Sequence, residues 1–373
     1  MSLALRKLQY WLRGFIGPPR MDVPLLLALL LLSAIGVVLL YSASGGDHDM
    51  VMKQSIRLLI GFSAMWVISR LKPSALMQAT PWLYLAGLVF LALIPVFGDG
   101  RSANNWLRLG PLVFQPAEIL KLALPMMVAW YLHARPLPPG WRDIGVCVGL
   151  IGLPTAMVIV QPDLGSGLLV GSAGAFVLFL AGLGWARIAL FGALGVASIP
   201  LFWPLLHDYQ RERILNLIDP SRNPQASGWQ IEQSRIAVGS GGWDGKGYGN
   251  GTQSQLDFLP ERHTDFVFAV LSEEGGFIAV TALLLLYLFI VLRALYLAAE
   301  AHDLYSRLLG GGVALTFFVY VFVNAAMISG LLPVVGIPMP LLSYGGSSAV
   351  SLLASFGVLM GIAAQSHRRK HWR

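Results

Sequence analysis

The chain has 373 residues, of which 56% are hydrophobic and only 12% charged. Soluble domains carry about 25% charged residues, so this composition excludes a soluble globular protein and predicts an integral membrane protein. The net charge of +7 comes mainly from the chain ends and from short loops between apolar segments, which is typical of an oriented membrane protein and argues against a nucleic-acid partner. The single cysteine, Cys147, excludes an intrachain disulfide.

Ten apolar segments predict an all-α integral membrane protein with a polytopic bundle of about ten transmembrane helices, because a helix satisfies its own backbone hydrogen bonds in lipid. The spans are predicted near 24–42, 54–70, 79–97, 115–133, 144–160, 164–182, 187–206, 268–292, 308–328 and 344–364. Their even number places both termini on one side. The basic residues between spans assign that side to the cytoplasm.

The two ends of the chain are both basic. Residues 1–20 have apolar residues at helical spacing between arginines and lysine, which favours an amphipathic helix on an anionic membrane surface over a disordered tail. Residues 365–373 are predicted to be a basic cytoplasmic tail. The whole chain, 1–373, is treated as one membrane domain, in which residues 207–263 form a large external loop between the seventh and eighth spans.

The first informative external loop covers residues 98–111, GDGRSANNWLRLGP. Its Trp106 suits the headgroup level, either as an ordinary aromatic belt residue or as part of a site, and Arg108 can meet phosphate. In the following span, Glu118 and Lys121 lie one helical turn apart on one face. This pair is either structural, or its lysine holds a pyrophosphate as a point charge.

Asp163 lies between two apolar runs that are separated by almost no loop. It can cap the next helix by accepting hydrogen bonds from free amides. Alternatively, it is an acid that lines a polar cavity or binds a divalent cation, Mg²⁺ or Mn²⁺. Asp265 is the other candidate ligand for such a cation, and no organic cofactor is expected.

The external loop 207–263 is too long and too polar to be a simple connection. Its segment 208–219 is amphipathic, with Arg211 and Arg213 beside apolar residues, and 228–242 reads as a short helix closed by glycines. GKGYGNG (245–251) lacks the GK[ST] ending of a nucleotide-binding loop. We therefore expect its glycines to let the backbone approach a bulky polar substrate.

The stretch 255–276 places many ionisable residues against the start of a long apolar run. Charge at the hydrocarbon boundary costs roughly 2.5–3.5 kcal/mol per residue, so it usually has a function. We predict that Asp265 is the catalytic group, in the first turn of a helix capped by Thr264, rather than a charge that merely stabilises the helix. Glu273 and Glu274 lie about 12–14 Å further along the helix, too far to form a dyad with it.

The segment 332–348, LPVVGIPMPLLSYGGSS, is rich in proline and glycine at membrane depth. Irregular backbone there is tolerated only where it is buried in protein or lines a wet cavity. The segment therefore predicts a site in the external half of the bundle.

Several strings resemble the SEDS family (shape, elongation, division and sporulation proteins) over essentially the whole chain. They are NNWLRLGPLVFQPAEILK, QPDLGSG, GSGGWDGKG, QSQLDFLPERHTDFVFAVLSEE and PMPLLSYGGSS. Within the family, Pro260 to Phe266 and the short N-terminal extension resemble the rod-shape branch; the division branch typically has Ala where this chain has Arg262.

This resemblance implies a glycosyltransferase of the bacterial inner membrane that polymerises lipid II in cell-wall elongation and releases undecaprenyl pyrophosphate outside the cytoplasm. It implies that Asp265 is essential and that Asp163, Lys121 and Trp106 are functionally important. It also implies a class B penicillin-binding protein as the transpeptidase partner, together with other membrane proteins of the elongation complex.

The chemistry of this reaction assigns roles to the predicted site residues. Asp265 is the predicted general base for the attacking sugar hydroxyl. Cations must stabilise the departing pyrophosphate. The candidates for that role are Lys121, Arg108, Arg211, Arg213 and Arg262, and the predicted substrate-binding set also includes Trp106, Glu118, Asp163, His263 and Ser343. A lipid II flippase is the alternative function, because charge and broken helices in a membrane also suit a transporter, and a scaffold that only recruits the partner is a third reading.

Overall fold

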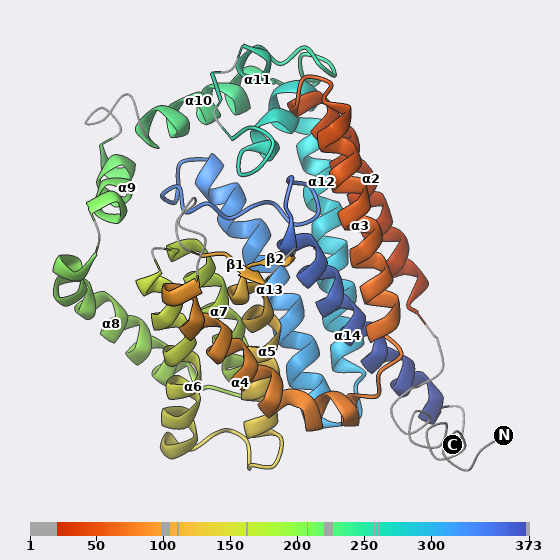
Figure 1. Ribbon diagram of the computed structural model, residues 1–373, viewed down its shortest axis with the longest axis vertical. Helices are drawn as coiled ribbons and strands as arrows, with labels where there is room; N and C mark the ends of the chain where they lie inside the picture. The colour runs from red at the N-terminus through yellow and green to blue at the C-terminus, as the bar shows by residue number, and fades with distance from the viewer. Residues whose placement is uncertain are drawn as a thin grey trace.

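The computed structural model describes residues 21–97, 105–109, 112–161, 163–206, 208–219, 227–256, 258–259 and 261–370, so the predicted amphipathic helix in residues 1–20 lies outside the described residues. The helices are α2 (Val23–Ala43), α3 (His48–Ile68), α4 (Pro73–Phe97), α5 (Pro116–Leu132), α6 (Trp141–Val160), α7 (Leu164–Leu180), α8 (Trp185–Phe202), η1 (Trp203–Leu205), α9 (Asp208–Ile218), α10 (Ser227–Ser240), α11 (Thr252–Gln255), α12 (Val267–Ala299), α13 (Leu304–Ile328) and α14 (Ser347–Lys370). The long helices form one bundle, with α10 and α11 across one end and α8 and α9 at its periphery (Figure 1).

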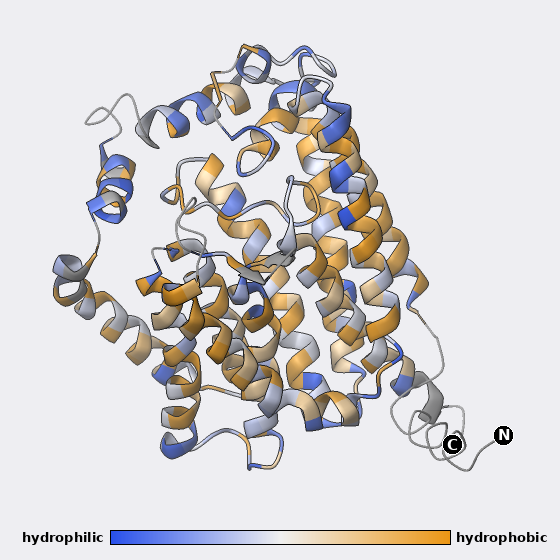
Figure 2. Cartoon of the chain, in the orientation of Figure 1, coloured by the Kyte–Doolittle hydropathy of each residue, from blue (hydrophilic) through white to orange (hydrophobic). Residues whose placement is uncertain are grey.

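Each of the ten predicted spans corresponds to a helix. Seven helices of the described chain are long and apolar enough to cross a membrane, namely α2, α3, α4, α6, α12, α13 and the part of α14 up to Gln365, while α7 and α8 are shorter apolar helices. The remaining predicted span, 115–133, corresponds to α5, which has 17 residues and carries Glu118 and Lys121. Apolar residues cover most of these helices (Figure 2), so the prediction of a polytopic helical membrane protein is confirmed.

A short antiparallel hairpin lies within the described residues and was not predicted from the sequence. Strand β1 (Leu107–Leu109) pairs with β2 (Leu112–Phe114), so that Leu107 faces Phe114 and Arg108 faces Val113. The hairpin leads directly into α5, whose first residue is Pro116. It therefore fixes how α5 enters the bundle.

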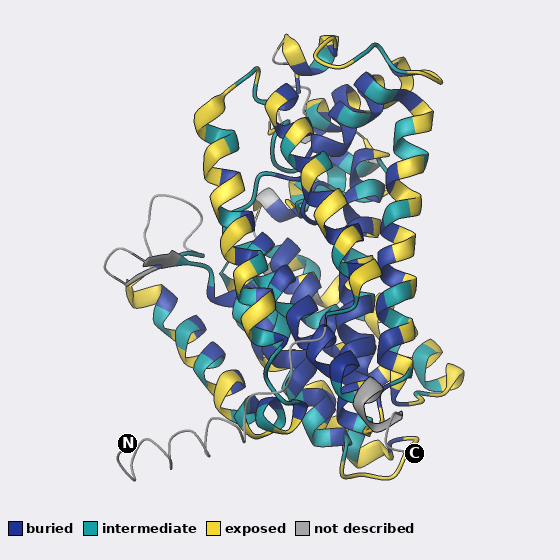
Figure 3. Cartoon of the chain, turned by 90° about the vertical axis from the view of Figure 1, so that its right-hand side faces the viewer, coloured by how far each residue is buried: buried dark blue, intermediate teal, exposed yellow. Residues whose placement is uncertain are grey.

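The core of the bundle is built around α13, most of which is buried, and α13 packs against α7 and α12. Helix α3 packs along α14, and α4 along α5. Figure 3 shows buried residues concentrated between the helices and exposed residues along their outer faces. Helix α14 continues to Lys370, so it includes most of residues 365–373, which the sequence assigned to a tail.

Helix α12 is interrupted at Gly276, whose backbone has a φ of 64°. The glycine-rich segment after α10 enters this break: the backbone amides of Lys246 and Gly247 donate to the carbonyls of Glu273 and Glu274, and Phe277 donates to Gly242. A side chain at position 276 would place its Cβ 2.3 Å from the amide nitrogen of Gly245. The loop thus supplies the hydrogen bonds that the broken helix lacks.

The glutamates at the start of α12 anchor the same loop. Glu273, fully buried, accepts hydrogen bonds from Lys246 Nζ (2.7 Å), Thr252 Oγ1 (3.0 Å) and the amide of Gln253 (2.9 Å). Glu274 accepts one from Ser42 Oγ of α2 (2.6 Å). Within 245–251, Gly245 and Gly251 approach residues of α12. The approach of the segment's glycines to a substrate stays a prediction.

Candidate active site

A cavity of about 1540 Å³ lies in the half of the bundle nearer α10 and α11. Its walls come from α3, α5, the start of α7, α9, the turn before α12, the irregular segment 335–348 and α14. The prediction that segment 332–348 lines a site is therefore supported by its position. The charged side chains that line the cavity are Arg57, Glu118, Lys121, Asp163, Arg213 and Asp265.

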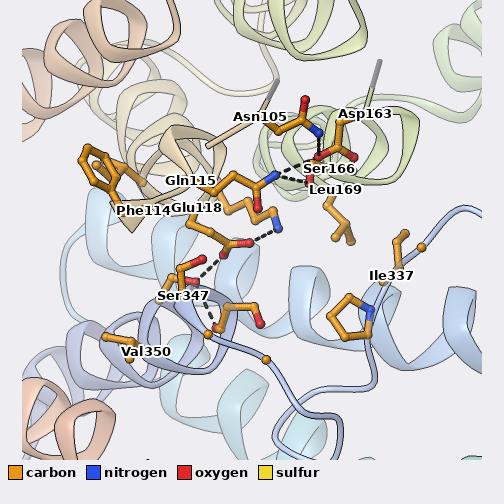
Figure 4. A pocket seen from close by; sticks show the side chains of 18 of the residues that line it. Asn105, Phe114, Gln115, Glu118, Asp163, Ser166, Leu169, Ile337, Ser347 and Val350 are labelled. Carbon is orange, nitrogen blue, oxygen red and sulfur yellow. Dashed lines mark hydrogen bonds and ion pairs between the residues drawn. The ribbon is translucent and has the colours of Figure 1, made fainter. Parts of the chain in front are cut away.

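Glu118 and Lys121 form a buried ion pair on the floor of this cavity. The distance from Lys121 Nζ to Glu118 Oε1 is 2.6 Å, and the side chains are only 8% and 7% exposed. The second carboxylate oxygen, Oε2, accepts a hydrogen bond from Ser351 Oγ of α14 at 2.5 Å, and the ammonium lies 5.2 Å from the centre of the Tyr320 ring. Both charges are thus satisfied within the protein, and the predicted one-turn pairing is confirmed. Figure 4 labels Glu118 and marks its interactions with dashed lines.

Asp163 caps α7 and also holds the entry to α5. Its Oδ1 accepts from the amide of Ser166 at 2.8 Å. Its Oδ2 accepts from the amide side chains of Gln115 (2.8 Å) and Asn105 (3.2 Å), and Figure 4 shows these groups converging. The capping prediction is confirmed, and Asp163 lines the cavity as well.

Asp265 lies in the turn that precedes α12, which begins at Val267, and not in the first turn of the helix as predicted. Thr264 does not cap the helix either, because its hydroxyl bonds to the carbonyl (3.1 Å) and the carboxylate (2.8 Å) of Glu261. The carboxylate of Asp265 lines the cavity. Its Oδ2 lies 3.5 Å from the position that a Cβ on Gly336 would occupy, so Asp265 sits directly beside the segment 335–338.

The pKa of Asp265 is raised to about 6, mainly because burial disfavours the charged carboxylate. The negative charges of Glu261 and Asp163 raise it further, whereas the guanidinium of Arg213 lowers it. A carboxylate with a pKa near 6 is still mostly ionised at neutral pH and is a stronger base than an ordinary aspartate. This combination suits a general base.

Arg57 of α3 was not predicted from the sequence, yet it reaches the same cavity. It lies about 14 Å from the start of α3, at 1.5 Å per residue. Its guanidinium is 4.6 Å from the centre of the Tyr344 ring, and its buried Nη1 has no hydrogen-bond partner in the described part of the chain. A buried, unused donor on a cation points to an anionic ligand.

The predicted site residues whose side chains the structure describes divide into two groups. Trp106, Glu118, Lys121, Asp163, Arg213 and Asp265 line the cavity. Arg211, Arg262, His263 and Ser343 do not line it. The backbone of Arg108 lies in β1, but its side chain is outside the described residues.

The four residues outside the cavity make contacts within the protein. Arg211 donates to the carbonyls of Trp203 (3.0 Å) and Pro204 (2.7 Å). Arg262 donates to the carbonyl of Ser254, and the ring of His263 packs against Tyr344. Ser343 Oγ accepts from the amide of Met339 at 2.8 Å. These contacts fit roles in shaping the loops.

The described residues include no group of three or more His, Cys, Asp or Glu side chains that could hold a metal ion. Asp163 and Asp265 both line the cavity, but the two oxygens of Asp163 already accept hydrogen bonds. Mg²⁺ is commonly held by one or two carboxylates together with substrate phosphates. A divalent cation at Asp163 or Asp265 therefore stays a prediction.

The fold and the cavity define a class: a polytopic helical membrane protein whose bundle encloses a charged cavity beside an irregular segment. The chain belongs to the FtsW/RodA/SpoVE family of cell cycle proteins, whose profile matches residues 23–368. This confirms the family resemblance seen in the sequence motifs.

Curated relatives match nearly end to end. The chain is 45% identical over 359 residues to the peptidoglycan glycosyltransferase MrdB of Escherichia coli K12, covering 96% of each chain. It is 35% identical to a probable peptidoglycan glycosyltransferase FtsW of Geobacter sulfurreducens, covering 93% of this chain and 96% of the relative.

Solved structures match the fold over the same extent. One is a chain in the structure of a peptidoglycan synthase complex that coordinates polymerization and crosslinking. It matches with a TM-score of 0.82 and 33% identity, and the match covers 93% of this chain and 99% of that one. Another is the rod shape determining protein RodA of Thermus thermophilus, with a TM-score of 0.70, 31% identity and coverage of 92% and 96%.

Proposed function

We propose that this protein is a peptidoglycan glycosyltransferase that polymerises lipid II into glycan strands during cell-wall elongation and so maintains rod shape. The relatives named for this activity support the proposal. The observation that carries it is the cavity itself, in which a carboxylate with a raised pKa, Asp265, lies in the same space as three cationic side chains. A reaction that removes a proton and expels a pyrophosphate needs both.

In the proposed reaction, Asp265 takes the proton of the acceptor's 4-hydroxyl group. The oxygen then forms a bond to the anomeric carbon of the donor sugar. The bond from that carbon to the pyrophosphate oxygen breaks, and the electron pair leaves with undecaprenyl pyrophosphate. A positioned base of this kind contributes typically 10²–10⁴-fold to the rate.

The cations of the cavity differ in how available they are to the leaving group. Lys121 is paired with Glu118, and Arg213 lies close enough to Asp265 to lower its pKa. Arg57 has a buried donor without a partner and forms no ion pair with any described residue. We assign Arg57 to the pyrophosphate, with Lys121 and Arg213 stabilising the charge that develops there.

Mg²⁺ or Mn²⁺ could be held by Asp163 and Asp265 together with the substrate's phosphates, where it would supply further positive charge to the leaving group. None of the steps assigned to Asp265 and Arg57 requires it. Exhaustive chelation that leaves the rate of the purified protein unchanged would remove this cation from the proposal.

The proposed orientation puts the cavity on the extracytoplasmic side of the inner membrane. Helix α2 begins and α14 ends at the end of the bundle opposite α10 and α11 (Figure 1). Basic residues gather in the connections at that same end, among them Arg70, Lys72, Arg135, Arg142, Arg187 and Arg307. By the positive-inside rule this end, and with it both termini, faces the cytoplasm.

The proposed partner is a class B penicillin-binding protein, which would crosslink the strands, within an elongation complex of further membrane proteins. Support comes from the similar chain in a peptidoglycan synthase complex that couples polymerization to crosslinking. The glycosyltransferase proposal is tested by incubating the purified protein with labelled lipid II in detergent, where transport has no meaning. Glycan chains are expected; unchanged lipid II in the presence of protein shown to be folded would favour the alternative of a flippase.

A further inference from the structure

A second cavity, of about 640 Å³, lies at the end of the bundle opposite α10 and α11 and shares no lining residue with the cavity that holds Asp265. It is bounded by the connection between α3 and α4, the end of α5, the start of α13 and the last turns of α14. We call it the basal cavity. At this end of a membrane-embedded bundle it lies at the level of the lipid headgroups.

Most of the ionisable side chains around the basal cavity are basic. Arg70, Lys72, His133 and His302 line it, and Asp303 is the one acid among the lining residues. The carboxylate of Asp303 is already engaged, because it caps α13 by accepting a hydrogen bond from the amide of Ser306 at 2.8 Å. The balance of charge therefore favours an anion.

The guanidinium of Arg70 is held in place, but one of its hydrogen-bond donors has no partner in the described part of the chain. Its guanidinium lies 3.6 Å from the centre of the Trp66 ring, which fixes its plane. Its buried Nε has no hydrogen-bond partner, and Arg70 forms no ion pair with any residue that the structure describes. A fixed guanidinium with a free donor is a common element of phosphate recognition.

Ser306 provides a second, independent sign of a ligand. The residue is 1% exposed, lines the cavity, and its hydroxyl oxygen has no hydrogen-bond partner. It lies in the first turn of α13, where the helix dipole favours negative charge. Helix α4 also begins at this cavity, with Pro73.

We propose that the basal cavity binds a phosphate-bearing anion through Arg70, Ser306 and Lys72, with the start of α13 contributing its positive end. An oxyanion accepts from the guanidinium and from the hydroxyl at once, which satisfies both buried groups. The phosphodiester of an anionic phospholipid and free inorganic phosphate share this chemistry. Basic pockets between transmembrane helices bind anionic headgroups in this way.

The test is native mass spectrometry of the full-length protein in detergent, titrated separately with phosphatidylglycerol, phosphatidylcholine and inorganic phosphate. Retention of one phosphatidylglycerol, or of one phosphate, in preference to phosphatidylcholine is the expected result, and the two arms identify the source of the anion. Arg70→Gln is expected to weaken that binding roughly tenfold or more, and Ser306→Ala by a smaller factor.

The matched control is Arg135→Gln, because Arg135 lies at the same end of the bundle and also stacks on an aromatic ring, that of Tyr131, but is paired with Asp143 and does not line the basal cavity. It is expected to bind as the wild type does. Thermal unfolding of each variant confirms that it is folded. Ser306→Ala removes only a hydroxyl that is unpartnered in the structure, so it keeps the test open if Arg70→Gln fails to fold. Binding that is equal for wild type, Arg70→Gln and Ser306→Ala, or equal for phosphatidylcholine, would overturn the proposal.

Discussion

Asn324 holds the backbone of Asp265 against the segment that forms the neighbouring wall of the cavity. From near the C-terminal end of α13, its Nδ2 donates to the carbonyl of Asp265 at 2.9 Å and to the carbonyl of Ile337 at 2.7 Å. Asn324 is fully buried, and its bond to Ile337 is buried with it. One amide group thus ties the turn before α12 to the irregular segment 335–338, and the position of the proposed base depends on it.

Asn324→Ala is therefore expected to lower kcat of glycan polymerisation by roughly 10²-fold, the loss associated with misplacing a reacting group by about 1 Å. The variant keeps Asp265 itself, so the apparent pKa of the acidic limb of its pH–rate profile should stay near that of the wild type. Steady-state rates across pH, with thermal unfolding as a check on folding, measure both. A wild-type kcat in Asn324→Ala would show that this clamp does not position the base.

The pKa of Asp265 near 6 predicts the pH dependence of the reaction. The base works only when deprotonated, so the rate should rise with pH, reach half its maximum near pH 6 and level off about one pH unit higher. Arg213 lowers this pKa, so Arg213→Gln should raise it and move the acidic limb to higher pH. Arg211→Gln, on the same helix but directed at backbone carbonyls outside the cavity, should leave the limb in place. The same apparent pKa for the acidic limb of the pH–rate profile in wild type, Arg213→Gln and Arg211→Gln would contradict the proposed role of Arg213.

Arg57 is expected to act on the leaving group. Removing a donor that stabilises charge in a transition state typically costs about 10²–10³ in kcat, so Arg57→Gln should lose activity on that scale, and Arg57→Lys should recover part of it. Lys53, one turn earlier on α3, is exposed and does not line the cavity, so Lys53→Gln serves as the control. Equal rates for Arg57→Gln and Lys53→Gln in the lipid II assay would remove Arg57 from the reaction.

The ion pair between Glu118 and Lys121 predicts a stability effect that is separate from catalysis. Both side chains are buried, so Glu118→Gln leaves an uncompensated ammonium and should cost about 3–5 kcal/mol of the free energy of unfolding. The double variant Glu118→Gln/Lys121→Met removes both charges and should lose less than the sum of the two single variants. Denaturant unfolding in detergent measures the free energy of unfolding of each variant, and the four values together give the coupling free energy between the two side chains. Strictly additive losses would mean that the two charges do not interact.

Much of this architecture follows from the sequence. Hydropathy locates the spans because a membrane helix must be apolar over its whole length. The local features were equally accessible: Asp163 as a cap and the one-turn pairing of Glu118 with Lys121 depend only on positions a few residues apart. Motif resemblance added Asp265, although helix geometry placed it two residues too far into α12.

The remaining features depend on contacts between distant parts of the chain. Arg57 reads as an ordinary charged residue in α3 until α3 packs along α14 and brings it to Tyr344. Ser351 is one serine among several in α14, and only packing makes it a partner of Glu118. The glycines after α10 gave no hint that they would fill the break at Gly276, because that break is stabilised by the loop itself.

The most direct measurement is the rate at which purified Asp265→Asn polymerises labelled lipid II in detergent, alongside a binding measurement with the same substrate. The asparagine keeps the size of the side chain but cannot accept the proton, so no glycan chains should form while lipid II is still bound. Polymerisation by Asp265→Asn at the wild-type rate would contradict the assignment of this carboxylate as the base.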